Sequence, residues 1–309
     1  MSFNDSLDFA PSLIKFQRES APFHVILSGY LRSSKTFELY AMLEKLEGLT
    51  SRLIPFELRD DKSAGVKRTL DDLLQLLRAE QNFRSIMVSD PFKRALHHLV
   101  DEVTDRARDC GAINVVLKKH SRIIGDNFDG AAFFAGATER CGVEFERKKM
   151  VFLGCGGVTS AVSSRLVNVL QKVGLVDLNS SEAQSLAEIL KRINSAIDLE
   201  IIPASGSRDF RDYDYVYNGT GLGKSDSRSP IDPADRFNKS GIAFDANYTP
   251  AATTFLKQLG EKGYTSVNGL SHMLMCSSMH LTAVTGDSVP YETVERAYEE
   301  IVKGRSGLS

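Results

Sequence analysis

The chain has 309 residues, of which 42% are hydrophobic and 25% are charged, and its formal net charge is −2. This composition fits a globular protein of one large or two medium-sized domains, and it gives no reason to expect nucleic acid or an anionic membrane as a partner. No apolar stretch approaches the roughly 18 residues that a membrane-spanning helix needs, and residues 1–20 do not resemble a signal peptide.

Strand and helix patterns alternate through the first half of the chain. Apolar runs predict strands at 23–27, 53–58, 84–88, 112–117 and 122–126. Apolar residues at helical spacing predict helices over 37–46 and 70–77, and Pro91 is expected to open another that runs through Leu99. The strand at 53–58 contains Pro55, which favours a sheet edge, and the last two strands read as a hairpin. The alternation therefore predicts an open α/β sheet that is mixed.

The second half repeats the alternation after a helix at 131–138 and a polar connector at 144–149. Strands are expected near 151–153, 173–177, 199–203, 214–217, 242–245 and 265–267, with helices that include 180–193 and 250–260. Residues 223–230 read as a surface loop. Two further helices, 272–285 and 290–303, have no strand left to pair with and are expected to return to the first domain. The fold class is therefore two doubly wound α/β domains, 1–131 plus 278–309 and 132–277.

A glycine-rich turn follows the apolar run at 151–153. It contains Gly154, Cys155, Gly156, Gly157 and Val158, and Asp177 stands at the end of the next strand. Such a turn lets the backbone approach a pyrophosphate at a helix N-terminus, while the acidic residue accepts ribose hydroxyls. Similar turns also close ordinary βα units, but the flanking strand and helix patterns favour a dinucleotide site.

Three short segments of the first half concentrate polar residues. They are Ser33-Ser34-Lys35-Thr36, Ser89 with Lys93, and Asn114 followed by Asp126-Asn127-Phe128-Asp129. Each has a structural alternative: a helix N-cap, a solvated lysine and a capping aspartate. A lysine in the first turn of a helix is unfavourable for the helix dipole, which favours another role for Lys93. An aspartate that pairs with it would hold it for proton exchange with an alcohol or ketone.

Together these segments resemble the shikimate/quinate dehydrogenase family, in order from about Ser28 to Gly286. The resemblance implies that Ser34 and Thr36 grip a substrate carboxylate and that Lys93 and Asp129 are the catalytic pair. It assigns three further residues to the substrate: Ser89, Asn114 and Tyr248. It also implies that a loop beside the nicotinamide contains Asn218, Gly219, Thr220 and Gly221, with Gly269 as a further cofactor residue.

The chain departs from the family pattern at several positions of the substrate site. Met87 replaces the asparagine that opens the lysine motif, and Cys276 falls where the family has a substrate-binding glutamine. Ser33 and Phe37 also differ from the pattern. A buried ring hydroxyl that loses such an amide partner costs roughly 1–3 kcal/mol. We therefore expect a related cyclic acid with fewer, different or amino substituents to be a candidate substrate.

The end of the second strand of the dinucleotide domain predicts the cofactor. In relatives that resemble the NADP-dependent enzymes, an arginine here holds the 2′-phosphate. This chain instead has Asp177, Leu178 and Asn179, and no lysine or arginine follows until Lys191. A carboxylate binds the ribose hydroxyls and repels a phosphate, so NAD is the expected cofactor.

The sequence thus predicts an NAD-dependent oxidoreductase that moves a hydride between the nicotinamide and a ring carbon of a small cyclic carboxylic acid. A relative that senses NAD or a ligand without turnover is the alternative. Four cysteines lie far apart without metal-ligand spacing: Cys110, Cys141, Cys155 and Cys276. They favour reduced thiols in a cytoplasmic protein without a metal centre. We expect a monomer or homodimer.

Overall fold

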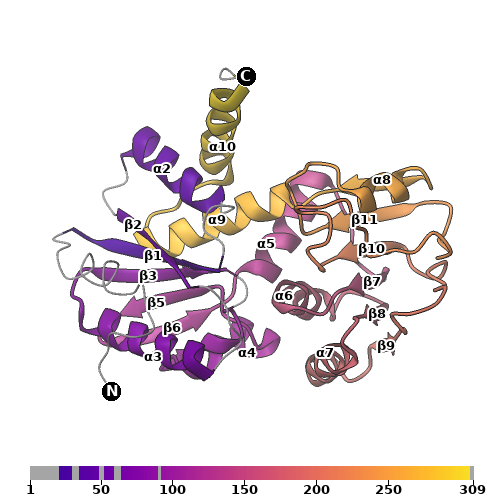
Figure 1. Ribbon diagram of the computed structural model, residues 1–309, viewed down its shortest axis with the longest axis horizontal. Helices are drawn as coiled ribbons and strands as arrows, with labels where there is room; N and C mark the ends of the chain where they lie inside the picture. The colour runs from indigo at the N-terminus through magenta and orange to yellow at the C-terminus, as the bar shows by residue number, and fades with distance from the viewer. Residues whose placement is uncertain (1–20, 30–34, 49–51, 59–63, 90–91, 307–309) are drawn as a thin grey trace. The chain divides into compact units, whose positions relative to one another are not determined.

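The computed structural model describes residues 21–29, 35–48, 52–58, 64–89 and 92–306, which fall into two compact units (Figure 1). Unit 1 contains the described residues up to Arg108, Ala112–Asn127 and those from His280 onward. Unit 2 contains Asp109–Gly111 and Phe128–Met279. Each unit has a six-stranded sheet of its own.

Unit 1 is built on a mixed sheet with the strand order β2-β1-β3-β5-β6-β4. Its strands are β1 (Phe23–Ser28), β2 (Arg52–Glu57), β3 (Phe83–Val88), β4 (Glu102–Val103), β5 (Val115–Lys119) and β6 (Arg122–Asp126). Strand β5 runs antiparallel to both of its neighbours, and the other pairs are parallel. The mixed sheet and the hairpin are confirmed. Strand β2, which contains Pro55, is an edge strand as predicted, because proline cannot donate a hydrogen bond to a second neighbour.

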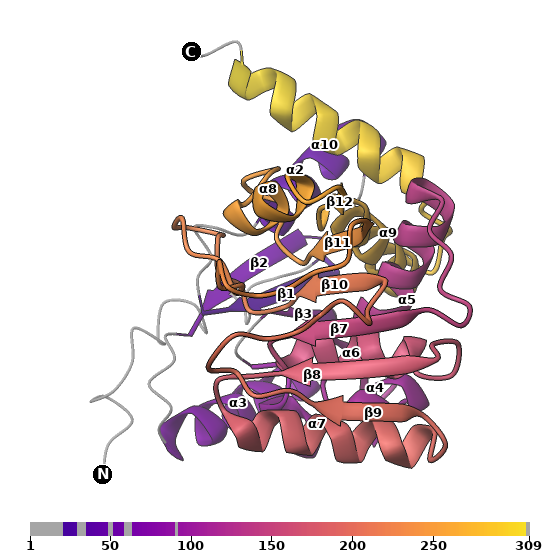
Figure 2. The same ribbon diagram turned by 90° about the vertical axis from the view of Figure 1, so that its right-hand side faces the viewer.

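Helices cover this sheet and bring the end of the chain back to unit 1. They are α2 (Lys35–Glu47), α3 (Ala64–Ala79), α4 (Asp105–Cys110), α9 (Leu270–Thr285), whose last residues belong to this unit, and α10 (Tyr291–Ser306). Helix α10 packs against α2, and Arg296 forms an ion pair with Glu47 (Figures 1 and 2). The expected return of the C-terminal helices to the first domain is therefore confirmed.

The core of unit 1 follows from the alternation of side chains along its strands. Phe23, Val25 and Leu27 of β1 lie on one face of the sheet, in one apolar cluster with the buried leucines of α3. His24 points to the opposite face and is 2% exposed. Its Nδ1 lies 2.8 Å from the hydroxyl of Ser85, its register partner on β3. Burial, reinforced by the charge of Arg84, lowers the pKa of His24 to about 4.

The buried histidine predicts how the stability of the protein depends on pH. Because the pKa of His24 is lower in the folded than in the unfolded chain, acid favours the unfolded chain as the pH falls from about 6.5 towards 4. We expect His24 to remove roughly 2 kcal/mol of unfolding free energy between pH 7 and pH 5. Urea unfolding at both pH values should show a smaller loss for His24→Gln than for the wild type. Equal losses in the two proteins would contradict this role.

Part of the region after β3 differs from the predicted helix. The structure has a short 3-10 helix, η2 (Ala95–His98), and Asp90 and Pro91 lie outside the described residues. The carbonyl of Lys93 accepts a hydrogen bond from the backbone N–H of Ile113 at 2.8 Å, and the N–H of His97 goes to Arg94 instead. Residues 92–94 form turns that precede η2, so Lys93 does not lie in the first turn of a helix. The argument that Lys93 opposes a helix dipole is therefore wrong.

Unit 2 is an all-parallel sheet with the strand order β12-β11-β10-β7-β8-β9. Its strands are β7 (Lys149–Leu153), β8 (Lys172–Val176), β9 (Asp198–Ile201), β10 (Tyr215–Asn218), β11 (Gly241–Asp245) and β12 (Tyr264–Val267). Counted from its own first strand, this order is 6-5-4-1-2-3, that of doubly wound folds that bind dinucleotides. The second domain is thus confirmed as a Rossmann-like sheet (Figure 2).

Helices cover both faces of the second sheet. They are α5 (Asp129–Ala135) with the π-helical turn η3 (Gly136–Arg140), α6 (Gly157–Leu166), α7 (Ser180–Ile193) and α8 (Thr254–Gly260). Apolar residues of α5, α6 and α7 form one core cluster with the sheet, and those of α8 form another. Helix α8 begins four residues later than predicted, because Thr253 caps it by accepting a hydrogen bond from the N–H of Leu256.

Candidate functional site

The glycine-rich turn of unit 2 joins β7 to α6 in the expected way. Gly154 has a φ of +86°, and a Cβ added there would lie 2.9 Å from the backbone nitrogen of Thr220, so both conformation and close packing require glycine. Gly156 is the N-cap of α6, and a Cβ added there would meet nothing within 4 Å. Gly156 has no side chain to cap the first N–H groups of α6, and the open space beside its α-carbon leaves room for a phosphate.

A cavity of about 620 Å³ opens in unit 2 at the carboxyl ends of β7, β8 and β10. Cavities of this size hold small ligands, and in open α/β sheets ligands bind where the strand order reverses. Six of the residues predicted to bind the cofactor line it: Gly154, Gly156, Asp177, Leu178, Gly219 and Thr220. The other six predicted cofactor residues are not among its lining residues: Cys155, Gly157, Val158, Asn218, Gly221 and Gly269.

Asp177 is held at this cavity by the backbone. Its two carboxylate oxygens accept hydrogen bonds from the N–H groups of Cys155 at 2.7 Å and Asn179 at 2.8 Å. The neighbouring Leu178 is 92% exposed and also lines the cavity. The carboxylate is thus fixed in place but keeps lone pairs that hydroxyl groups can reach. This arrangement suits a ligand that offers two hydroxyls.

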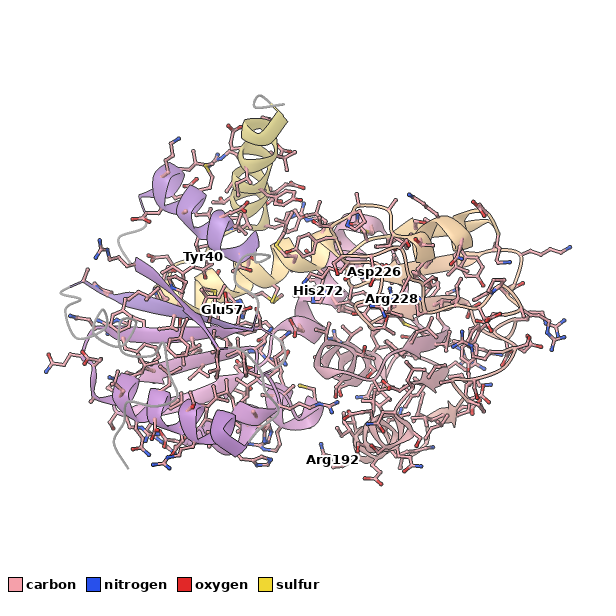
Figure 3. The ribbon with its side chains drawn as sticks, viewed as in Figure 1. Tyr40, Glu57, Arg192, Asp226, Arg228 and His272 are labelled. Carbon is pink, nitrogen blue, oxygen red and sulfur yellow. The ribbon has the colours of Figure 1, made fainter. Side chains whose placement is uncertain are left out.

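Several residues that line the cavity were not predicted from the sequence. Arg208 lines it, but its guanidinium is paired with the buried carboxylate of Asp235 and donates to the carbonyl of Pro230 at 2.9 Å. Residues 224–228 of the predicted surface loop are exposed, and Asp226 pairs with Arg228 there (Figure 3). The end of that loop, however, turns in to line the cavity with Ser229 and Pro230. No local pattern marks these residues as cavity walls.

Asn218 is fully buried, and its amide holds the loop beside it. The side-chain carbonyl accepts from the N–H and hydroxyl of Thr220 at 3.1 and 2.6 Å, and the NH2 group donates to Asp245 at 3.1 Å. Asp245 also accepts from the hydroxyl of Thr253 at 2.6 Å, and burial raises the pKa of this carboxyl. Asn247 donates to the carbonyl of Leu222 at 3.0 Å. The network therefore ties the 218–222 loop to the turn that carries the half-buried Tyr248.

In unit 1, the predicted substrate residues Ser89 and Asn114 lie together at one end of the strands of the mixed sheet. The carboxyl ends of β1, β3 and β6 and the start of β5 share this end, because β5 alone among these strands runs in the opposite direction. Ser89 follows β3 and donates its N–H to Leu27, while Asn114 precedes β5 and accepts the N–H of Val88 at 2.8 Å. Lys93 and Asn114 are 7% and 1% exposed.

Other predicted residues of unit 1 are placed only in part. Thr36 is half-buried in the first turn of α2, whereas Ser33 and Ser34 lie outside the described residues. Met87 is 3% exposed in the interior of β3, between Ile26 of β1 and Val115 of β5.

The two aspartates of the Gly-Asp-Asn-Phe-Asp-Gly run have different surroundings. Asp126, at the end of β6, accepts two hydrogen bonds from Arg106 at 3.2 and 2.6 Å and one from Thr104 at 2.5 Å. These bonds outweigh burial and hold the pKa of Asp126 below its usual value. Asp126 therefore anchors the start of α4, which the sequence did not predict.

Asp129 is the first residue of α5 in unit 2 and is 6% exposed. A Cβ added at the next residue, Gly130, would lie 2.3 Å from the carbonyl of Ala161, so this glycine allows α5 to pack closely on α6. Two side chains of α9 approach the Oδ1 of Asp129: the thiol of Cys276 at 3.7 Å and Nε2 of His272 at 3.9 Å. Two residues that the sequence predicted for the site, Asp129 and Cys276, therefore lie close together in the structure. His272, which the sequence did not predict, lies beside them.

Comparison with known proteins assigns the family. A model of the shikimate dehydrogenase substrate binding domain matches residues 27–116. The shikimate dehydrogenase (NADP(+)) of Carboxydothermus hydrogenoformans is 30% identical over 221 residues, which cover 70% of this chain and 77% of that enzyme. The chain belongs to the shikimate dehydrogenase family. It is an oxidoreductase of the shikimate/quinate dehydrogenase type, as the sequence motifs predicted.

Solved structures of the shikimate dehydrogenase family share the fold. Shikimate 5-dehydrogenase from Listeria monocytogenes, in complex with shikimate and NAD, matches with a TM-score of 0.76 at 22% identity, over 89% of this chain and 96% of that one. Quinate dehydrogenase from Corynebacterium glutamicum, in complex with NAD, matches with a TM-score of 0.74 at 24% identity, over 91% of this chain and 99% of that one. Within the described part of the chain, no helix combines the length and apolarity that crossing a bilayer requires.

Proposed function

We propose that this protein is an NAD-dependent dehydrogenase that oxidises or reduces a ring alcohol or ketone of a cyclic hydroxy-carboxylic acid. The observation that carries the cofactor assignment is Asp177, fixed by two backbone N–H groups at the wall of the unit 2 cavity. Among the described residues that line this cavity, the one cation is Arg208, and Asp235 already neutralises it. A 2′-phosphate would meet a carboxylate without a cation to balance it.

The residues of unit 2 fit a nicotinamide dinucleotide. The open space at Gly156 and the N-terminus of α6 suit the pyrophosphate, and Asp177 suits the two hydroxyls of the adenosine ribose. The 218–222 loop, held by Asn218, would support the nicotinamide end. When bound, NAD supplies the hydride acceptor. Relatives of this fold were crystallised with NAD or with NADP, which supports a nicotinamide dinucleotide as the cofactor.

Lys93 and Asp129 are proposed as the acid–base pair. During oxidation the neutral amine of Lys93 would take the proton of the substrate hydroxyl, and during reduction the ammonium of Lys93 would return it. The carboxylate of Asp129 would orient the lysine and stabilise its ammonium form. Both side chains are more than 90% buried in the folded chain, so each is shielded from bulk water. Low access to water strengthens the electrostatic effect of a charged group on its neighbours.

The proposed substrate is a cyclic acid whose carboxylate is held by the hydroxyls of Ser34 and Thr36. Ser89, Asn114 and Tyr248 are the proposed ligands of ring substituents. A thiol at position 276 and a thioether at position 87 cannot replace the hydrogen bonds of two amides. Shikimate and quinate should therefore bind with high KM, while a ring with fewer or different substituents should bind better.

Restoring the two amides tests this view of the substrate. Met87→Asn together with Cys276→Gln should raise kcat/KM for shikimate and quinate by roughly tenfold or more, because a regained buried hydrogen bond contributes about 1–3 kcal/mol. Met87→Leu with Cys276→Ala, which adds no amide, is the matched control. Steady-state kinetics of the three proteins on both acids would refute the proposal if the wild type is already efficient or if the amide variant is no better.

A sensor without turnover is the second candidate, and the altered positions 87 and 276 are what favour it. Quenching of protein fluorescence by NAD, followed by NADH production from a panel of cyclic hydroxy acids, separates the two. NADH formation with any of these acids supports the dehydrogenase. NAD binding without NADH formation across the panel supports the sensor.

A further inference from the structure

His272 is one of three side chains that approach one another at the N-terminus of α5. It lies one helical turn before Cys276 on α9, and residues four apart share a helix face. Its Nε2 lies 3.9 Å from the Oδ1 of Asp129, and the thiol of Cys276 lies 3.7 Å from the same oxygen. The side chains of His272 and Asp129 are 11% and 8% exposed. An imidazole therefore faces the proposed catalytic carboxylate with little water around it.

The imidazole of His272 is held in this position by its surroundings in unit 2. Its ring meets the edge of Phe133 at a centroid distance of 5.8 Å and an angle of 86°. The start of α9 is fixed on both sides: the N–H of Gly269 donates to the carbonyl of Asn247 at 3.0 Å, and Gly136 packs on the backbone of Ser271. His272 and Asp129 thus belong to elements that are packed rigidly within one unit.

Other polar and charged groups of unit 2 belong to the elements around the imidazole. Asp245 and His272 line the same small cavity, but the carboxylate of Asp245 is occupied by Asn218 and Thr253. On the turn that packs against the start of α9, Glu139 and Arg140 are exposed. The thiol of Cys141 contacts the hydroxyl of Ser271 rather than the ring. The carboxylate of Asp129 lies 3.9 Å from the Nε2 of His272.

We propose that His272 is a positioning residue that controls the carboxylate of Asp129 according to its own protonation. When the imidazole of His272 is neutral, Lys93 is the cation with which the carboxylate of Asp129 interacts. When the imidazole takes up a proton from solvent, the resulting imidazolium attracts the same carboxylate at a distance of about 4 Å. The second cation competes with the lysine, so acid should switch the dehydrogenase off. This inference rests on the proposed role of Lys93 and Asp129.

The first test measures the pH profile of kcat/KM between pH 6 and pH 9 with the best substrate of the panel. For each protein, kcat/KM at pH 6 is divided by kcat/KM at pH 9. This ratio should be larger in His272→Gln than in the wild type by about threefold or more. His98→Gln, an exposed histidine of unit 1, is the matched control and should follow the wild-type profile. An acid limb that is unchanged in His272→Gln would overturn the positioning role.

The second test needs no turnover and no altered histidine. The full-length protein is labelled with isotopes at its histidines, and the titration of His272 is followed by NMR in the wild type and in Asp129→Asn. Loss of the carboxylate charge should move the midpoint for His272 to lower pH by about 1 pH unit. A midpoint that stays in place overturns the inference. Turnover of Asp129→Asn is measured separately. If this variant keeps its turnover, the assignment of Lys93 and Asp129 as the catalytic pair is wrong, whatever the titration of His272 shows.

Discussion

Replacement of Lys93 by alanine should lower kcat by at least about 100-fold, with the affinity for NAD near that of the wild type. General acid–base groups contribute rate factors of roughly this size. Lys93 belongs to unit 1, whereas the cavity proposed for the adenosine belongs entirely to unit 2. The change should therefore affect the chemical step and not the cofactor. Single-turnover kinetics and NAD titration by fluorescence measure the two quantities.

A buried lysine can also be structural, so the Lys93→Ala variant needs a matched control. Lys118 lies on β5 of the same sheet, and its ammonium donates to the carbonyls of Arg78 and Glu80 at 2.8 and 2.7 Å. Burial lowers the pKa of Lys118, as expected for a partly enclosed lysine. Lys118→Ala should reduce thermal stability but leave kcat within about threefold. Asp129→Asn should resemble Lys93→Ala and damage substrate binding more. If Lys93→Ala retained most of its rate, the catalytic assignment would be wrong.

The protein should prefer NAD over NADP by at least about tenfold in kcat/KM. Bringing a 2′-phosphate to Asp177 places like charges side by side, and such contacts cost several kcal/mol when water is excluded. Asp177→Ala should shrink the preference, because the repulsion and the ribose hydrogen bonds disappear together. Initial rates with both cofactors at saturating substrate give the ratio.

Asp177 also accepts hydrogen bonds from Cys155 and Asn179, so a substitution could disturb the glycine turn itself. Asp177→Asn is the milder variant, since its amide oxygen can still accept one of these bonds. Asp198→Ala removes an exposed carboxylate at the start of β9 and should leave the cofactor ratio unchanged. Equal use of NAD and NADP by the wild-type protein would refute the ribose assignment.

The sequence by itself determined the features that depend on short stretches of chain. Apolar runs in the sequence predicted eleven of the described strands. Pro55 correctly predicted that β2 is an edge strand, because proline has no backbone N–H to donate to a second neighbouring strand. The glycines at 154 and 156 predicted the turn between β7 and α6, since backbone conformation and the absence of Cβ act locally. The ordered motifs predicted the family, which the comparisons confirmed.

Contacts between distant segments were decided only by the tertiary structure. Strand β4 is two residues long, and α4 begins where Thr104 and Arg106 meet Asp126, so neither element has a strong local pattern. Turns and the 3-10 helix η2 stand where the sequence predicted a longer helix, and there the carbonyl of Lys93 accepts a hydrogen bond from the N–H of Ile113, a residue from a later segment.

The same reason explains what the sequence missed in the candidate site. Arg208 lines the cavity proposed for the cofactor and is neutralised by Asp235, although neither residue belongs to a recognisable motif. His272 approaches Asp129 from a helix more than a hundred residues later in the chain. Periodicity and motif spacing report on neighbours along the backbone, whereas the charge around a catalytic carboxylate depends on which side chains the folded chain brings within a few ångströms of it.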